Sequence, residues 1–159
     1  MTKRIFVLAA FLTLAVTGGA LAGSTGRSAH VVSTAKNATL GKTVLVNLKG
    51  RTLYSLSVER KGKFICTDKT CLSFWHPLVV KAGVTPTGAK SLGTVRRPDG
   101  SRQVTYRGGP LYTFSGDQRR NDAKGEGFKD VGVWHAATAG ASAPPAATTT
   151  TTTGGGYYG

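Results

Sequence analysis

Short runs of β-branched and apolar residues alternate along the chain with turns rich in Gly, Pro, Asp and Asn. Such runs are typical of β-strands, and no long segment keeps the 3.6-residue period of an amphipathic helix. Pro98-Asp99-Gly100 between two β-rich runs predicts a hairpin turn, because proline presets φ and glycine accepts positive φ. The predicted strands are residues 30–35, 43–48, 52–58, 103–106, 111–115 and 131–137.

One short helix is predicted around Thr70 to Trp75, with Asp68 as its N-cap and Pro77 as its stop. The sequence therefore predicts an all-β fold. We expect a small antiparallel sandwich or barrel-like domain with one or two short helical turns.

The chain contains an internal repeat of about sixty residues. Residues 46–59 align without gaps with residues 104–117, and a Leu-Tyr pair is identical in both copies. A Trp-His pair follows each copy, at Trp75-His76 and Trp134-His135. Two tandem hairpin units, at about residues 44–78 and 102–137, are expected to complete one core.

The N-terminal residues 1–22 have the three parts of a secretory signal peptide: a basic start, a short apolar run and Ala-Leu-Ala before the cleavage point. The alternative is an uncleaved membrane anchor, although the run is shorter than the roughly 20 residues that span a bilayer. No later stretch approaches that length, and no cysteine follows the cleavage point for lipid attachment. The prediction is a secreted, extracellular or envelope protein without a lipid anchor.

The remaining chain divides into a polar leader at 23–29, a β domain at 30–137 and a tail at 138–159. The tail consists mainly of Ala, Pro, Thr and Gly, and buries too little apolar surface to offset its ordering entropy. It is expected to be disordered, either unmodified or glycosylated on its hydroxyl groups.

Two cysteines, Cys66 and Cys71, lie close together in a chain predicted to be exported. A disulfide is the expected state in that compartment. A redox or metal pair is the alternative, but the spacing is not C-x-x-C and no second pair of ligands is present.

The chain is strongly basic, with 21 Lys and Arg against 7 Asp and Glu. Such a field attracts anionic partners, and we expect an anionic wall polymer or membrane surface; charge that serves only solubility is the alternative. Nucleic acid is disfavoured by the export signal and by the lack of a recognition motif. The candidate binding residues form three small clusters: Arg60, Lys61 and Lys63; Arg96 and Arg97; Arg119 and Arg120.

Tyr112 and Asp117 are spaced as Y-x4-D, and Tyr54 and Glu59 repeat the pattern. An offset of five places two side chains on opposite faces of a straight strand, so a turn is needed if they are to meet. The preferred interpretation is a structural lock, in which each carboxylate accepts bonds from turn amides or a tyrosine hydroxyl. The other is a binding or acid–base carboxylate.

The paired histidines, His76 and His135, raise the alternative of a metal, redox or catalytic centre completed by Asp117 or Glu59. The preferred interpretation places Trp75 and Trp134 in the core and leaves the histidines at strand ends. No nucleophile elbow or zinc-protease motif is present, so no catalytic residue, metal or cofactor is predicted.

The second repeat carries Tyr112-Thr113-Phe114-Ser115-Gly116-Asp117, after Leu92-Gly93-Thr94 and Asp99-Gly100. It resembles a bacterial secreted-repeat family of exported proteins and predicted lipoproteins with the motif Y-x-(F/W/Y)-x-x-D. The first repeat departs from this motif at Leu56 and Glu59. The family often has proline and tyrosine at the positions of His76 and His135, which weakens a shared metal role. The resemblance implies the fold and the location, and supplies no activity.

These observations predict an exported, non-catalytic β module that associates electrostatically with anionic envelope or extracellular polymers.

Overall fold

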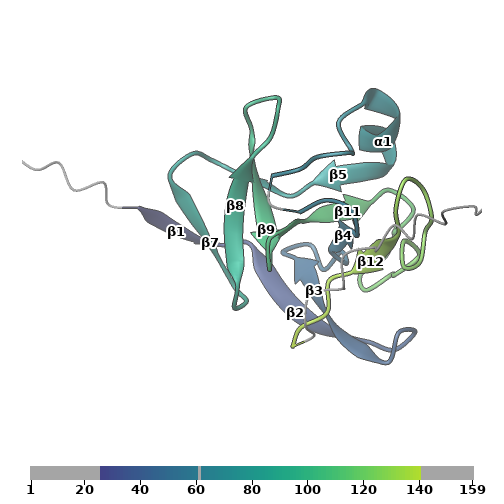
Figure 1. Cartoon of the computed structure of the whole chain (residues 1–159). Helices are drawn as coiled ribbons and strands as arrows, with labels where there is room; N and C mark the ends of the chain where they lie inside the picture. The colour runs from purple at the N-terminus through teal and green to yellow at the C-terminus, as the bar shows by residue number, and fades with distance from the viewer. Residues whose placement is uncertain (1–25, 61, 141–159) are drawn as a thin grey trace, which may run out of the picture.

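The computed structural model describes residues 26–60 and 62–140. Residues 1–25, which include the predicted signal peptide, Lys61 and residues 141–159 lie outside this part. The described chain is mostly strands with one helix, α1 (Figure 1), which confirms the all-β class. No closed barrel forms there, and no helix is long and apolar enough to cross a membrane. The elements are β1 (Arg27–His30), β2 (Val32–Asn37), β3 (Lys42–Asn47), β4 (Tyr54–Leu56), α1 (Lys69–Phe74), β5 (Trp75–Pro77), β6 (Val79–Val80), β7 (Val84–Thr87), β8 (Leu92–Arg96), β9 (Arg102–Tyr106), β10 (Gly109–Pro110), β11 (Tyr112–Phe114) and β12 (Trp134–Ala136).

Helix α1 forms where the sequence predicted it. The Asp68 side chain accepts a hydrogen bond from the Cys71 amide at 3.0 Å, which caps the first turn. The helix stops earlier than expected, because Trp75 is already extended at φ −115° and ψ 103°. Pro77 therefore lies within β5 and does not end the helix.

The central sheet, in the order β12-β4-β11-β5, shows that the two repeats exchange strands. Equivalent strands β4 and β11 pair antiparallel at its centre, with Tyr54 opposite Tyr112. The tryptophan strand of each repeat then pairs with the tyrosine strand of the other: Trp75 lies opposite Phe114, and Trp134 lies opposite Leu56. This reciprocal pairing relates the repeats by an approximate two-fold axis between β4 and β11.

The outer hairpins also contact the opposite repeat. Strands β2 and β3 pair in the first repeat, as β8 and β9 do in the second. The Val104 amide donates to Leu78 O at 2.8 Å, and the Leu45 amide donates to Ala137 O at 2.7 Å. Each hairpin is thus bonded to the chain that follows the other repeat's tryptophan, so neither repeat is a separate unit.

The gapless alignment of the repeats is wrong before the turns. In the first repeat, Thr52 lies opposite Val46. Its equivalent in the second repeat, Pro110, lies opposite Thr105 and not opposite Val104, the residue that the gapless alignment matches with Val46. The reason is turn chemistry: Arg107 and Gly108 both have positive φ in a two-residue turn, whereas the first repeat uses a longer turn with Gly50 at φ 76°. Val46 therefore corresponds to Thr105, and the repeats match in step only after the turn.

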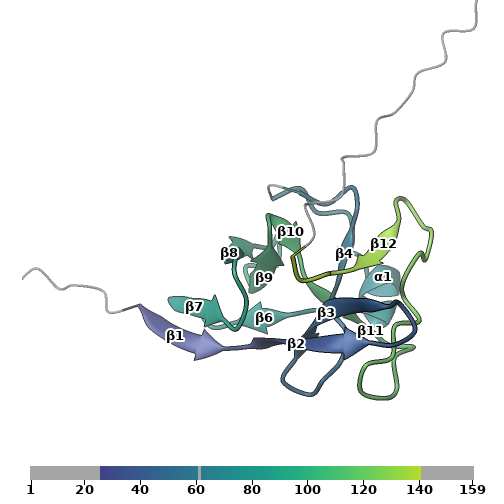
Figure 2. The ribbon, with the colours of Figure 1, turned by 90° about the horizontal axis from the view of Figure 1, so that it is seen from below.

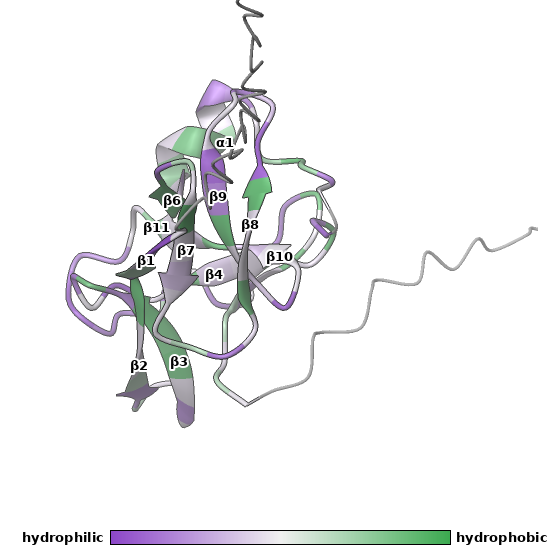
Figure 3. Ribbon diagram, turned by 90° about the vertical axis from the view of Figure 1, so that its left-hand side faces the viewer, coloured by the Kyte–Doolittle hydropathy of each residue, from purple (hydrophilic) through white to green (hydrophobic). Residues whose placement is uncertain are grey.

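Two apolar clusters result from the exchange, and each draws on both repeats. In the first, the Trp75 and Trp134 rings stack with centroids 3.7 Å apart and planes 6° apart. Tyr54 packs edge-on against Trp75, and Tyr112 packs edge-on against Trp134. The second cluster is aliphatic, and β3 contributes to both (Figure 3, green). Its buried members are Val32, Leu45, Leu53, Val104, Leu111 and Ala137.

One strand pair is parallel, unlike the expected antiparallel arrangement. Strand β1 pairs with β7, with Arg27 opposite Val84 (Figure 2). β1 lies largely in the segment expected to be a polar leader. It is followed directly by β2, so the run predicted at residues 30–35 belongs to two strands.

Candidate functional site

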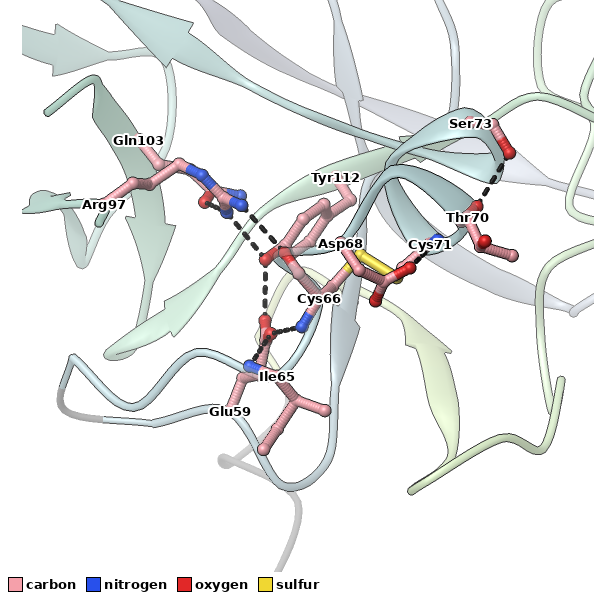
Figure 4. The surroundings of a disulfide bond; sticks show 10 residues. All are labelled: Glu59, Ile65, Cys66, Asp68, Thr70, Cys71, Ser73, Arg97, Gln103 and Tyr112. Atoms are coloured by element: carbon pink, nitrogen blue, oxygen red, sulfur yellow. Dashed lines mark hydrogen bonds between the residues drawn. A yellow bond between two sulfur atoms is a disulfide. The ribbon is translucent and has the colours of Figure 1, made fainter. Parts of the chain in front are cut away.

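The Glu59 carboxylate is fully buried beside the disulfide (Figure 4). One oxygen accepts the amides of Ile65 and Cys66, each at 2.7 Å. The other accepts the hydroxyl of Tyr112 at 2.8 Å. Turn amides and a tyrosine hydroxyl therefore hold this carboxylate, and the tyrosine comes from the other repeat.

The Asp117 carboxylate has the equivalent environment. It accepts the hydroxyl of Tyr54 at 2.7 Å and the amide of Lys124 at 3.0 Å. Burial raises the pKa of Asp117, while the bond from Tyr54 opposes that shift. The tyrosine–carboxylate pairs thus form between repeats, and the Y-x4-D residues of one repeat do not pair with each other.

Both tyrosines stay protonated in these sites. Burial raises the pKa of Tyr54 and of Tyr112 far above the usual range, and the neighbouring carboxylates add to the shift. Each hydroxyl is therefore a permanent donor. Two buried pairs, Tyr54–Asp117 and Tyr112–Glu59, lie on opposite sides of the tryptophan stack and join the repeats. Both carboxylates are buried and already hydrogen-bonded to the protein.

Arg97 lies in the interior and not in a surface cluster as expected. It is 3% exposed and donates to Gln103 Oε1 at 2.5 Å, to the hydroxyl of Tyr112 at 3.0 Å and to Cys66 O at 2.8 Å. It therefore forms a chain with Tyr112 and Glu59 (Figure 4). Its neighbour Arg96, the last residue of β8, is exposed.

The histidines do not converge. His76 on β5 and His135 on β12 occupy the two outer strands of the central sheet, with β4 and β11 between them. At about 4.8 Å per strand this separates them by about 14 Å. His135 Nδ1 instead lies 3.0 Å from Glu126 Oε1. No group of three or more potential metal ligands occurs within residues 26–60 and 62–140, so the alternative centre is not favoured.

Cys66 and Cys71 form the predicted disulfide, with Cα atoms 5.4 Å apart. The bridge lies at the edge of an apolar pocket of about 490 Å³ between α1 and the loop at 128–131. A pocket of this kind can accommodate a hydrophobic group. Of its two acidic side chains, Asp68 and Asp130, the first is already engaged in capping α1. The apolar side chains that line it include Phe74, Trp75, Phe114, Phe128 and Val131.

Basic residues from three distant segments meet at the end of β2. The loop carrying Arg119 and Arg120 docks there through Asn121, whose side chain donates to Lys36 O at 2.6 Å and whose amide donates to Gly50 O at 2.9 Å. A Cβ on Gly50 would lie 2.6 Å from Arg120 Nε, so this glycine permits the close approach. We define the β2 patch as the exposed residues Lys36, Lys49, Arg119 and Arg120.

Two further basic residues, Arg96 and Arg102, lie at the end of the β8–β9 pair. A Cβ on Gly62 would lie 3.8 Å from Val95 Cγ2, so Gly62 lies beside this strand. Arg96 and Arg102 are directly opposite each other in the β8–β9 register. We define the β8 patch as the exposed residues Arg96 and Arg102. Neighbouring residues of a strand face opposite sides, so the contact with Gly62 lies on the other side of β8 from Arg96 and does not join the sequence clusters at 60–63 and 96. Lys61 lies outside the described residues.

The fold and the site define a small all-β protein made of two interlocked repeats, whose recurring tyrosines, carboxylates and tryptophans hold it together. Residues 93–138 match a family described as a secreted repeat of unknown function. The match covers the second repeat with Tyr112 and Asp117, and excludes the first repeat, where Leu56 and Glu59 depart from the expected motif. No curated protein and no solved structure matches the chain.

Proposed function

We propose that the protein is an exported, non-catalytic module that binds anionic polymers of the cell envelope or its surroundings. The convergence of Lys36 with Arg119 and Arg120 carries this proposal, because Lys36 lies more than eighty positions before the two arginines in the sequence and all three are exposed. Asp122, two residues after Arg120, is engaged by the amides of Gln118 and Arg119 at 2.9 and 3.0 Å. The patch therefore keeps a positive field.

The buried scaffold supports the same conclusion. Interlocked strands and the disulfide fix the positions of the loops that carry the charges, which lowers the entropy lost when a ligand binds. Arginine presents a planar fork of donors that fits carboxylate and phosphate oxygens. A polymer with repeated oxyanions can therefore bind this surface without a deep pocket.

Binding to isolated bacterial cell walls is expected to weaken at least about tenfold between about 0.05 M and about 1 M salt, because exposed charges are screened. A pull-down across this range measures the effect. The triple variant Lys36→Gln, Arg119→Gln, Arg120→Gln should bind several-fold more weakly at low salt.

The matched control is the triple variant Lys69→Gln, Lys81→Gln, Lys90→Gln, which removes the same charge from exposed residues outside both patches. It should retain most of the binding. Retention that is indifferent to salt, or an equal loss in both triple variants, would refute the proposal.

A further inference from the structure

We propose that the apolar pocket beside the disulfide binds two aromatic side chains from the C-terminal segment of the same chain, Tyr157 and Tyr158. The pocket shares no residue with the β2 patch, so this contact goes beyond the proposed function and is independent of it. Three features carry the assignment: exposed apolar side chains at the mouth of the pocket, an aromatic wall, and the composition and length of residues 141–159.

The mouth of the pocket exposes apolar surface. Phe74 is 53%, Phe128 47% and Val131 61% exposed, and all three line the pocket. In the described part of the chain, only Leu48 and Val79 are further large hydrophobic residues with exposed side chains. Apolar surface gathered in one place is typical of a binding site, whereas single exposed apolar residues are ordinary. An apolar group that covers this mouth would remove that surface from water.

The wall of the pocket is aromatic. The Trp75 and Phe114 rings lie with their centroids 4.5 Å apart, and the Phe128 ring lies 6.0 Å from the first and 6.1 Å from the second. Another ring can join such a group, since aromatic rings attract one another at centroid separations of about 4.5–7 Å. An aromatic side chain therefore fits this wall better than an aliphatic one.

The polar groups at the mouth favour a neutral phenol. Asp68, Lys129 and Asp130 line the pocket and are exposed, and the lysine offsets one of the two carboxylates. The mouth therefore offers little net charge to an ionic ligand. A tyrosine combines a ring that can contact the wall with a hydroxyl that can donate to a carboxylate.

The C-terminal segment supplies tyrosines that can reach this pocket. Residues 141–159 carry no charged side chain, and Tyr157 and Tyr158 are the only aromatic residues among them. Val131, at the mouth, precedes Gly140 by nine residues, so the two lie at most about 32 Å apart. The 17 residues from Gly140 to Tyr157 can span up to about 60 Å. The tyrosines can therefore occupy the pocket of their own chain, and an intramolecular contact benefits from a high effective concentration.

Two-dimensional NMR of the chain with its C-terminal segment intact tests this assignment. Replacing both tyrosines, Tyr157→Ser and Tyr158→Ser, is expected to shift the amide signals of pocket residues such as Phe74 and Val131, because the tyrosine rings leave the mouth. A dye-labelled synthetic peptide with the sequence of residues 154–159 should bind the double variant at least about fivefold more tightly than the wild-type chain, whose own tyrosines compete. Fluorescence anisotropy measures both affinities.

Further variants locate the peptide site. Adding Phe74→Ser and Val131→Ser to the tyrosine double variant should abolish peptide binding, while adding Leu48→Ser, at a residue 59% exposed and outside the pocket, should retain it. Unchanged melting temperatures exclude unfolding as the cause.

Equal peptide affinities of the wild-type chain and the tyrosine double variant, or unshifted signals at the pocket, would overturn the assignment. Shifts that depend on protein concentration would also overturn it, because the occupant would then be the C-terminal segment of a second copy. None of these results bears on salt-sensitive binding to cell walls, so the proposed function stands or fails separately.

Discussion

Replacing Trp134 by alanine is expected to lower the free energy of unfolding by about 3–5 kcal/mol. The side chain is fully buried, stacks on Trp75 at 3.7 Å and packs edge-on against Tyr112. Alanine leaves a large cavity at the contact between the repeats and removes both ring pairs, each of which adds about 0.5–1.5 kcal/mol beyond area burial. Urea denaturation with the disulfide intact measures the loss.

Trp75→Ala should cost a similar amount, because the exchange gives both tryptophans equivalent places. The double variant should cost less than the sum of the two, since each single variant already removes the stack. Val131→Ala is the control, because Val131 is 61% exposed and its loss should change stability by less than about 0.5 kcal/mol. A loss below about 1 kcal/mol in both tryptophan variants would contradict this packing.

Replacing Arg97 by methionine is expected to destabilise the fold by about 3–5 kcal/mol, since it breaks a buried charge network. The change leaves Glu59 buried without the cation that reaches it through Tyr112, and removes the donors to Gln103 and Cys66 O. Chemical denaturation measures this loss. Arg96→Met is a matched control, because its exposed side chain should contribute less than about 0.5 kcal/mol.

A second change separates the charge from the packing. Adding Glu59→Gln to Arg97→Met removes the uncompensated carboxylate, and should restore part of the lost stability. If Arg96→Met and Arg97→Met have equal effects, the buried network does not contribute as described.

The class of fold follows from the sequence because its signals are local. Alternating short runs predict strands, Asp68 caps the predicted helix, and Cys66 and Cys71 are close enough along the chain to pair. The repeat also identifies Tyr54, Tyr112, Trp75 and Trp134 as architectural. These inferences need no knowledge of which strands meet.

The exchange between repeats is not a local property. Each repeat offers the same tyrosine, carboxylate and tryptophan, so pairing within a repeat and pairing between repeats satisfy the same sequence pattern. One signal does favour exchange: an offset of five points Tyr112 and Asp117 to opposite faces of a straight strand. The β2 patch is not a local property either, because Lys36 and Arg119 come together only when the loop at 119–121 docks in the tertiary fold.

The burial of Arg97 was predictable in part. Adjacent residues of an extended chain face opposite sides, so Arg96, the last residue of β8, and the following Arg97 do not share one exposed surface. Which of the two points inward cannot be read from the sequence, since it depends on Glu59 and Tyr112, which the tertiary fold places beside Arg97.

A pair of double-mutant cycles tests the exchange of strands between repeats most directly. Urea denaturation of Tyr54→Phe, Asp117→Ala and the double variant is expected to give a coupling energy of at least about 1 kcal/mol, because the hydroxyl donates to the carboxylate across the repeats. The cycle of Tyr112→Phe with Asp117→Ala, which lie in the same repeat, should be additive within about 0.5 kcal/mol. Strong coupling within the repeat and additivity between repeats would contradict the interlocked fold.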